Sequence, residues 1–120
     1  MDRLEHMLSI QKSLNDAIRD KRDLHGIAPE TWIQKHTLAI ISELSELLDE
    51  VNFKWWKNPK AIDTPALKEE LVDILHFFLS MCLEAGLDAE EMYQIYLNKN
   101  AENFARQEGR SAKPGYAPEQ

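Results

Sequence analysis

Four stretches of the chain repeat apolar residues at the three- and four-residue spacing of an amphipathic helix. The first runs from about Leu4 to Gly26. The second begins at Pro29, a residue suited to the first turn of a helix, and continues to about Lys57, where Pro59 stops it. These two segments therefore predict two long helices joined by a short connection.

Capping and terminating residues predict where two further helices begin and end. Thr64 is a suitable N-cap before Pro65, and Gly86 suits the end of the third helix. The fourth helix starts with a capping-box pattern at Asp88 and ends near Gly109. No stretch alternates polar and apolar residues as a half-buried strand does. We therefore predict an all-α fold, a bundle of four to five helices with its site between helices.

The composition favours a single soluble helical domain. Of 120 residues, 43% are hydrophobic and 29% are charged, while glycine and proline are scarce. We assign residues 1–109 to this domain and residues 110–120 to a C-terminal tail. The net charge of -7 argues against a nucleic-acid partner, and no apolar run suits a membrane span or a signal peptide. We expect a cytoplasmic protein that forms a homo-oligomer, a dimer or a tetramer.

Two acidic pairs carry the strongest chemical signal. Glu43 with Glu46, and Glu70 with Asp73, are each three residues apart and so project from one face of a helix. Two antiparallel helices could aim these four carboxylates at one point. Oxygen-only ligands suit Mg²⁺, with Mn²⁺ as an alternative. We predict a metal site here, because the third helix is apolar around most of its circumference and should be covered on nearly all sides.

The second helix also carries a polar seam of the kind by which one helix faces another. The residues of this seam are Trp32, His36, Ala39, Glu43, Glu46, Glu50, Phe53 and Lys57. On the fourth helix, Lys99, Asn103 and Arg106 share a face. They could hold phosphate oxygens beside a metal cluster, or they could belong to an ordinary charged surface.

Four more polar or aromatic residues stand out on the predicted helices. Gln11 lies within the apolar stripe of the first helix, with Asn15 one turn later. Such amides could read a nucleobase edge or bond to neighbouring helices. Trp56 could stack on a base or pack in a core. His76, one turn after Asp73, could be a ligand, a supporting partner or a core histidine.

Several segments together resemble the all-α NTP pyrophosphatase superfamily, which includes MazG-like proteins and dimeric all-α dUTPases. The segments that carry this resemblance are QKSLND from Gln11, FKWWKN from Phe53, ELVDILHFFLS from Glu70 and YLNKNAENFARQ from Tyr96, beside the Glu-x-x-Glu pair. Their order matches the family over about residues 4–109, and the chain is most similar to a compact dUTPase. It lacks the extra helices of the dimeric dUTPases, which implies that neighbouring subunits complete the site.

The resemblance implies a role for each candidate. Mg²⁺ would be bound by Glu43, Glu46, Glu70 and Asp73. Glu43 or Glu46 would activate the attacking water. The phosphates would be bound by Lys57, Lys99, Asn103 and Arg106, and the deoxyuridine by Gln11, Asn15, Trp56 and His76. The implied reaction converts dUTP and water to dUMP and pyrophosphate.

Three other functions stay open at this stage. The first is a broader house-cleaning pyrophosphatase that acts on dCTP, dATP or modified nucleotides. A redox bundle that holds two metal ions would need Glu-x-x-His pairs, of which Asp73-x-x-His76 is the nearest approach. The third is a helical interaction module without catalytic activity, which would bind no nucleotide.

Overall fold

The computed structural model describes residues 1–116, and over that range it contains helices and no strand. The helices are α1 (Arg3–Arg22), α2 (Pro29–Glu50), α3 (Thr64–Glu84) and α4 (Ala89–Gln107). The predicted all-α class is therefore confirmed. None of these helices is long and apolar enough to cross a membrane. The chain divides into one unit that ends at Leu87 and a second that begins at Asp88.

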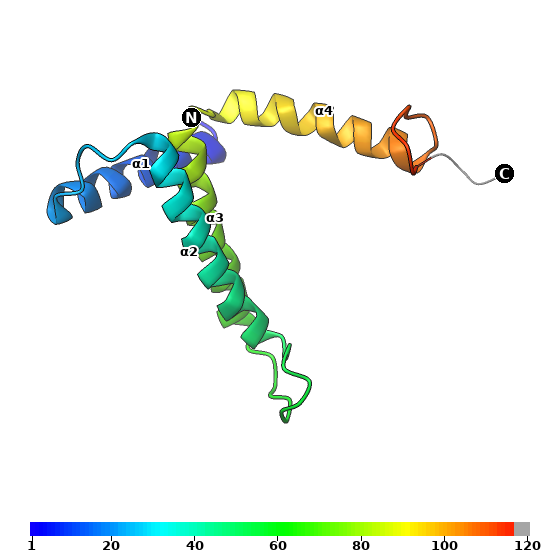
Figure 1. Cartoon of the computed structure of the whole chain (residues 1–120), viewed down its shortest axis with the longest axis horizontal. Helices are drawn as coiled ribbons and strands as arrows, with labels where there is room; N and C mark the ends of the chain where they lie inside the picture. The colour runs from blue at the N-terminus through cyan, green and yellow to red at the C-terminus, as the bar shows by residue number, and fades with distance from the viewer. Residues whose placement is uncertain (117–120) are drawn as a thin grey trace. The chain divides into compact units, whose positions relative to one another are not determined.

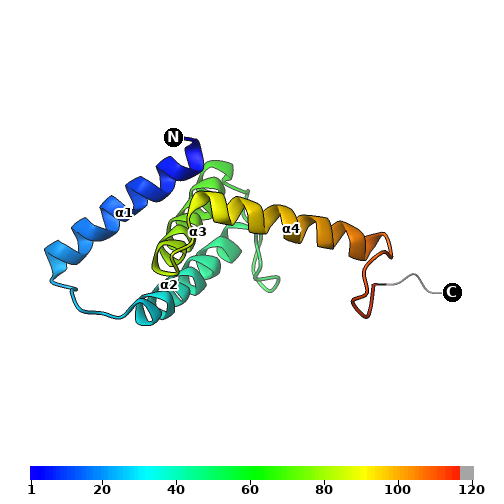
Figure 2. The same ribbon diagram turned by 90° about the horizontal axis from the view of Figure 1, so that it is seen from above.

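Helix α3 is the centre of the first unit. It runs antiparallel beside α2, and α1 packs against it as well (Figures 1 and 2). The small buried core lies where α1 meets α3 and contains Leu8, Leu79 and Cys82. Two polar side chains, Gln11 and Ser80, are equally buried in this contact. A polar interaction therefore lies inside the packing that holds α1 on α3.

Three of the four helices begin at an aspartate that caps the first turn. The carboxylates of Asp2, Asp63 and Asp88 each accept a hydrogen bond from the backbone N–H three residues later, at 2.8, 3.1 and 2.8 Å. The capping residue predicted at Asp88 is therefore confirmed. At α3 the cap is Asp63 rather than Thr64, because the aspartate one residue earlier supplies the stronger acceptor.

Helix α2 ends seven residues earlier than predicted, at Glu50 instead of Lys57. Asn52 has a left-handed backbone with φ of 57°. Its side-chain amide donates to the carbonyl of Lys60, and its side-chain oxygen accepts from the N–H of Lys60, both at 2.9 Å. These two bonds turn the chain into the α2–α3 loop. Lys57 therefore lies on this loop and not on the helical seam predicted from its spacing.

The expectation that α3 is covered on nearly all sides is wrong for the first unit taken by itself. Leu71, Val72 and Phe78 remain 51%, 50% and 43% exposed there. On α2, Leu38 and Ile41 are 67% and 56% exposed. The apolar circumference of α3 is larger than α1 and α2 can cover, so the unit presents an apolar surface of the kind that contacts other proteins.

The second unit consists of α4 and the residues that follow it. Gly109, at φ of 72°, ends the helix near the predicted position. The hydroxyl of Ser111 donates to the carboxylate of Glu102 at 2.7 Å, which holds the start of the predicted tail against α4. The rest of that tail, residues 117–120, lies outside the described residues. The division into a domain of residues 1–109 and a tail stays a prediction.

The two bonds made by Asn52 lead to a stability prediction. Asn52→Ala should lower the free energy of unfolding by about 1–3 kcal/mol, because it removes both bonds and places an alanine in the left-handed region. Urea unfolding measures this change. Asn52→Gly is the matched variant: it also loses the bonds but tolerates the backbone angle, so its loss should be smaller. Equal losses in both variants would show that the backbone angle contributes nothing.

Candidate active site

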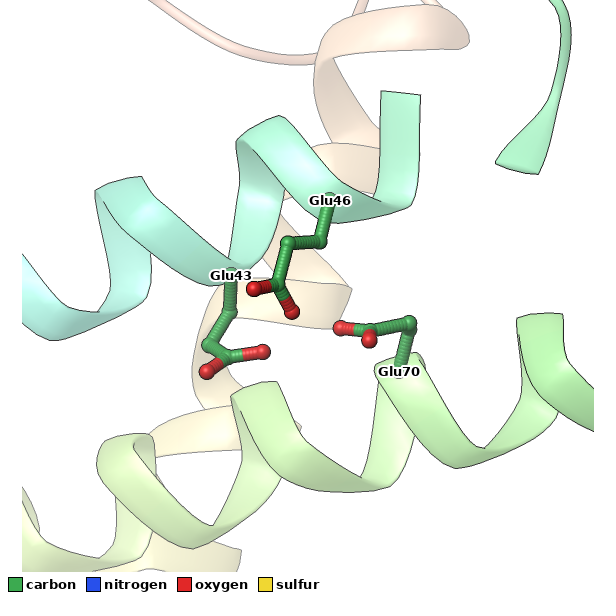
Figure 3. Close-up of side chains that lie close together, drawn as sticks. All are labelled: Glu43, Glu46 and Glu70. Carbon is green, nitrogen blue, oxygen red and sulfur yellow. The ribbon is translucent and has the colours of Figure 1, made fainter. Parts of the chain in front are cut away.

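Three carboxylates converge between α2 and α3. Glu43 and Glu46 project from α2 toward Glu70 on α3, and each offers an oxygen within 4.8 Å of the others (Figure 3). The i,i+3 spacing places the first two on one face of α2, and the antiparallel packing brings Glu70 opposite them. Asp73, the fourth predicted ligand, is exposed and is not part of this close group. The structure therefore brings together three of the four predicted carboxylates.

The donor set suits a hard divalent cation. One oxygen each of Glu43 and Glu70 is buried and has no hydrogen-bond partner. An ionised carboxylate oxygen without a donor is unfavourable unless a proton or a cation approaches it. Oxygen-only ligands are those that Mg²⁺ and Mn²⁺ prefer. These residues therefore fit such an ion, with Glu43, Glu46 and Glu70 as its holders.

The close approach of the three carboxylates raises the pKa values of Glu70 and Glu43. Burial, followed by hydrogen bonds to Glu43 and Glu46, raises the pKa of Glu70 to about 7 from the ordinary 4.5. A hydrogen bond from Glu70 lowers the pKa of Glu43, but burial and the charges of Glu46 and Asp73 outweigh it, so that pKa is also raised. Without a cation, the crowding of these carboxylates therefore favours the protonated form of Glu70 up to about neutral pH.

A pocket of about 380 Å³ lies among α1, α2 and α3, and it is lined by other residues of α2 and α3 than those of the cluster. Its apolar lining includes Leu14, Ile18 and Phe77. Gln11, Asn15 and His76, three of the residues predicted to bind the nucleoside, line it as well. Apolar walls with a few polar groups are typical of small-molecule sites. The structure thus brings these three side chains into one cavity.

The polar groups of the pocket bond to one another. Gln11 Nε2 donates to Asn15 Oδ1 at 3.0 Å, and His76 Nδ1 lies 2.5 Å from Gln11 Oε1. Asn15 Nδ2 in turn donates to the hydroxyl of Ser80 at 3.1 Å. These side chains come from two helices, so α1 and α3 hold the polar wall in a fixed arrangement.

The pocket lining also contains side chains that the sequence motifs did not assign to it. Trp32 stacks on His36, and the guanidinium of Arg19 lies 4.2 Å from the centroid of the Trp32 ring. Arg19 is also paired with Glu84. Burial, with a smaller contribution from Arg19, lowers the pKa of His36, and its buried Nε2 has no partner. Trp32 and His36 occupy the first two positions of the predicted seam. Their place in the seam was therefore the sequence signal that could have assigned them to the site.

Two predicted residues of the first unit lie elsewhere. Trp56 is 59% exposed and packs edge-on against Trp55 and Phe53 in the α2–α3 loop, away from the pocket lining. Lys57 borders a second cavity, of about 350 Å³, that also contains Lys54 and other polar residues of this loop. The loop therefore groups aromatic and cationic side chains, as its sequence suggests, but outside the nucleoside pocket.

The remaining predicted phosphate ligands belong to the second unit. Lys99, Asn103 and Arg106 lie on α4 at a spacing that shares one face. Arg106 donates to Glu102 at 3.1 Å, and its guanidinium lies 5.5 Å from the centroid of the Tyr116 ring. Binding of a phosphate by Arg106 would therefore compete with Glu102. The roles of these three residues stay predictions.

Comparison with known families identifies the first unit. Residues 3–88 match a family model described as dUTPase. The chain belongs to this dUTPase family. The matched residues contain α1, α2 and α3, and with them the carboxylate cluster and the pocket. The resemblance inferred from the sequence motifs is thereby confirmed, whereas the motif on α4 lies beyond the matched residues.

Individual relatives come from bacteriophages. A dCTP pyrophosphatase of Enterobacteria phage LZ5 is 35% identical, over 62% of this chain and 44% of the relative. A dCTP pyrophosphatase of Enterobacteria phage T4 is also 35% identical, over 65% of this chain and 60% of the relative. This member of the dUTPase family thus spans about half the length of the curated relatives it matches. No solved structure matches it.

The raised pKa of Glu70 predicts how the metal-free protein responds to pH. Because the folded state binds this proton more tightly than the unfolded chain, the stabilisation is fully present below pH 4.5 and is lost as pH rises through about 7. Glu70→Gln should remove this part of the pH dependence and melt above the wild type at pH 8 without divalent cations. Thermal melts across this pH range measure the difference.

Glu69→Gln is the control for that experiment. It changes the same charge at the adjacent, exposed position. The control should keep the wild-type pH profile, whereas parallel profiles for all three proteins would show that Glu70 is not the group responsible.

Proposed function

We propose that the chain is a Mg²⁺-dependent pyrophosphohydrolase of pyrimidine deoxynucleoside triphosphates, with dUTP and dCTP as substrates. The products would be the nucleoside monophosphate and pyrophosphate. The observation that carries the proposal is the convergence of Glu43, Glu46 and Glu70 on the same two helices that contribute imidazole groups to the pocket. Mn²⁺ would be an alternative cofactor, given the same oxygen ligands.

The spacing of the cluster and the pocket suits a nucleotide. His36 of the pocket and Glu43 of the cluster are seven residues apart on α2, which is about two helical turns or about 10 Å along one face. On α3, His76 and Glu70 are six residues apart. A nucleoside could therefore place its base in the pocket and its α-phosphate at the carboxylates.

The proposed reaction is attack of water on the α-phosphorus. The oxygen of water forms a new bond to that phosphorus, and the bond to the bridging oxygen of the β-phosphate breaks, so pyrophosphate leaves. A divalent cation, when bound, supplies positive charge that favours water ionisation and the leaving group. Glu43 or Glu46 accepts the proton of the water at a carboxylate oxygen. Glu70 holds the opposite side of the cluster from α3.

The choice of base rests on the family and the relatives. The matching family is described as dUTPase, and two relatives are named dCTP pyrophosphatase. Uracil and cytosine are both single-ring pyrimidines, and both are small relative to the 380 Å³ pocket. We therefore propose both dUTP and dCTP and keep activity on other deoxynucleotides as the competing outcome.

We also propose that copies of the chain associate. The apolar side chains that remain exposed on α2 and α3 would be covered by such contacts, in agreement with the predicted homo-oligomer. The sequence-based expectations of a dimer or tetramer and of a cytoplasmic location stay predictions.

Removal of one carboxylate tests the catalytic proposal. Glu46→Gln should reduce Mg²⁺-dependent pyrophosphate release by at least about a hundredfold, because the amide has neither the charge nor the basicity of the carboxylate. Glu30→Gln, which changes the same charge at the start of α2, should remain within about twofold of wild type. Circular dichroism checks that both variants are folded. Comparable activity in the two variants would refute the assignment.

A panel of nucleoside triphosphates tests the substrate. With Mg²⁺, pyrophosphate release from dUTP and dCTP should exceed that from the purine substrates dATP and dGTP by at least about tenfold in kcat/KM, since a pocket that holds a single-ring base would not place a two-ring base and its α-phosphate in the same way. Equal rates across the panel would favour a broad house-cleaning enzyme. The absence of any turnover and of a Mg²⁺-dependent rise in Tm would favour an interaction module.

A further inference from the structure

We propose that Ser80 is a positioning residue that fixes the direction of the hydrogen bonds in the pocket and thereby sets its choice between uracil and cytosine. The inference rests on the proposed function and names a residue with no predicted role. Ser80 is 2% exposed and lines the pocket from α3.

The direction of these hydrogen bonds is set first by the backbone carbonyl oxygen of His76, which can only accept a hydrogen bond. The hydroxyl of Ser80 lies 2.8 Å from the backbone carbonyl oxygen of His76, one turn earlier on α3. Since a carbonyl oxygen has no proton to give, the hydroxyl must use its single proton in this bond. Toward any other partner, Ser80 Oγ can therefore act only as an acceptor.

This constraint passes along the pocket wall. Because Ser80 Oγ accepts, Asn15 must turn its Nδ2 toward it, at 3.1 Å. Asn15 Oδ1 then faces Gln11 and accepts from Gln11 Nε2 at 3.0 Å. We call the chain of bonds from Ser80 through Asn15 and Gln11 to the imidazole of His76 the relay.

The relay ends by fixing a tautomer. With its Nε2 held by Asn15, Gln11 presents Oε1 to His76 Nδ1 at 2.5 Å. An amide oxygen accepts only, so Nδ1 must carry the proton. In the neutral imidazole, Nε2 is then a lone-pair acceptor. The second protons of the Gln11 and Asn15 amides remain as donors.

A fixed pattern of this kind can discriminate between two bases of equal size. Uracil presents a carbonyl and an N–H where cytosine presents an amino group and an unprotonated ring nitrogen. Apolar walls such as Leu14 and Phe77 contact both bases alike. Reversal of the relay would exchange donors and acceptors along the polar wall and so invert its preference. Because Ser80 is buried, water cannot easily take its place.

The experiment removes the hydroxyl from which the direction starts. In Ser80→Ala, either direction of the Gln11 and Asn15 amides becomes possible, so His76 should change from the Nδ1–H tautomer to a mixture. ¹⁵N NMR of the imidazole at pH 8 reads this directly, with His76→Asn used for assignment. The ratio of kcat/KM for the preferred pyrimidine over the other should fall by about fivefold or more.

Three variants complete the test. Ser80→Thr keeps the hydroxyl and should keep the tautomer and the ratio. Ser13→Ala removes a similar bond from a hydroxyl to the carbonyl one turn earlier, on an exposed position of α1, and should change neither. Asn15→Ala interrupts the relay from α1 and should give the same tautomer mixture, which tests the idea even when Ser80→Ala does not fold.

The outcomes separate this inference from the proposed function. A single Nδ1–H tautomer and an unchanged ratio in Ser80→Ala, with an active wild type, would overturn the role of Ser80 and leave the hydrolase intact. A wild type that hydrolyses neither dUTP nor dCTP would refute the function. In that case, persistence of the Nδ1–H tautomer in Ser80→Ala or Asn15→Ala would overturn the relay as well.

Discussion

The enforced proximity of three carboxylates is the constraint on which the proposed chemistry of this protein depends. Glu43 and Glu46 are fixed on α2 and Glu70 on α3, and these helices pack side by side. Like charges held this close cannot relax by moving apart without separating the helices. They must share a proton, as the raised pKa of Glu70 indicates, or attract a cation. The same geometry therefore explains the titration and the proposed metal.

Together with α1, the same two helices also line the pocket, and this links the proposed recognition to the proposed chemistry. Trp32 and His36 precede the carboxylates on α2, while His76 and Phe77 follow Glu70 on α3. A shift of α2 along α3 would alter both sites at once. In the proposed function, these helices would therefore set the distance between base and α-phosphate.

Much of this arrangement could be predicted from spacing alone, because residues three or four apart in sequence lie on the same face of a helix. The acidic pairs and the cap at Asp88 follow directly from local rules. The end of α2 does not, because it depends on bonds from Asn52 to Lys60 across the loop. The hydrogen bond of Ser80 could not be predicted for a related reason. In sequence, Ser80 is one small polar residue in an apolar run, and only tertiary packing gives it Asn15 as a partner.

The relay is partly buried, so its hydrogen bonds constrain one another as well as joining α1 to α3. Apolar side chains in place of the whole relay would pack these helices without requiring any hydrogen bond between their side chains. Buried polar groups lose stability when a partner is missing, so each bond of the relay constrains the next. If the relay sets a preference between two pyrimidines of the same shape, as we propose, it would do so through this constraint, because shape alone cannot distinguish them. In this proposal, the polar wall would supply the distinction that the apolar walls cannot.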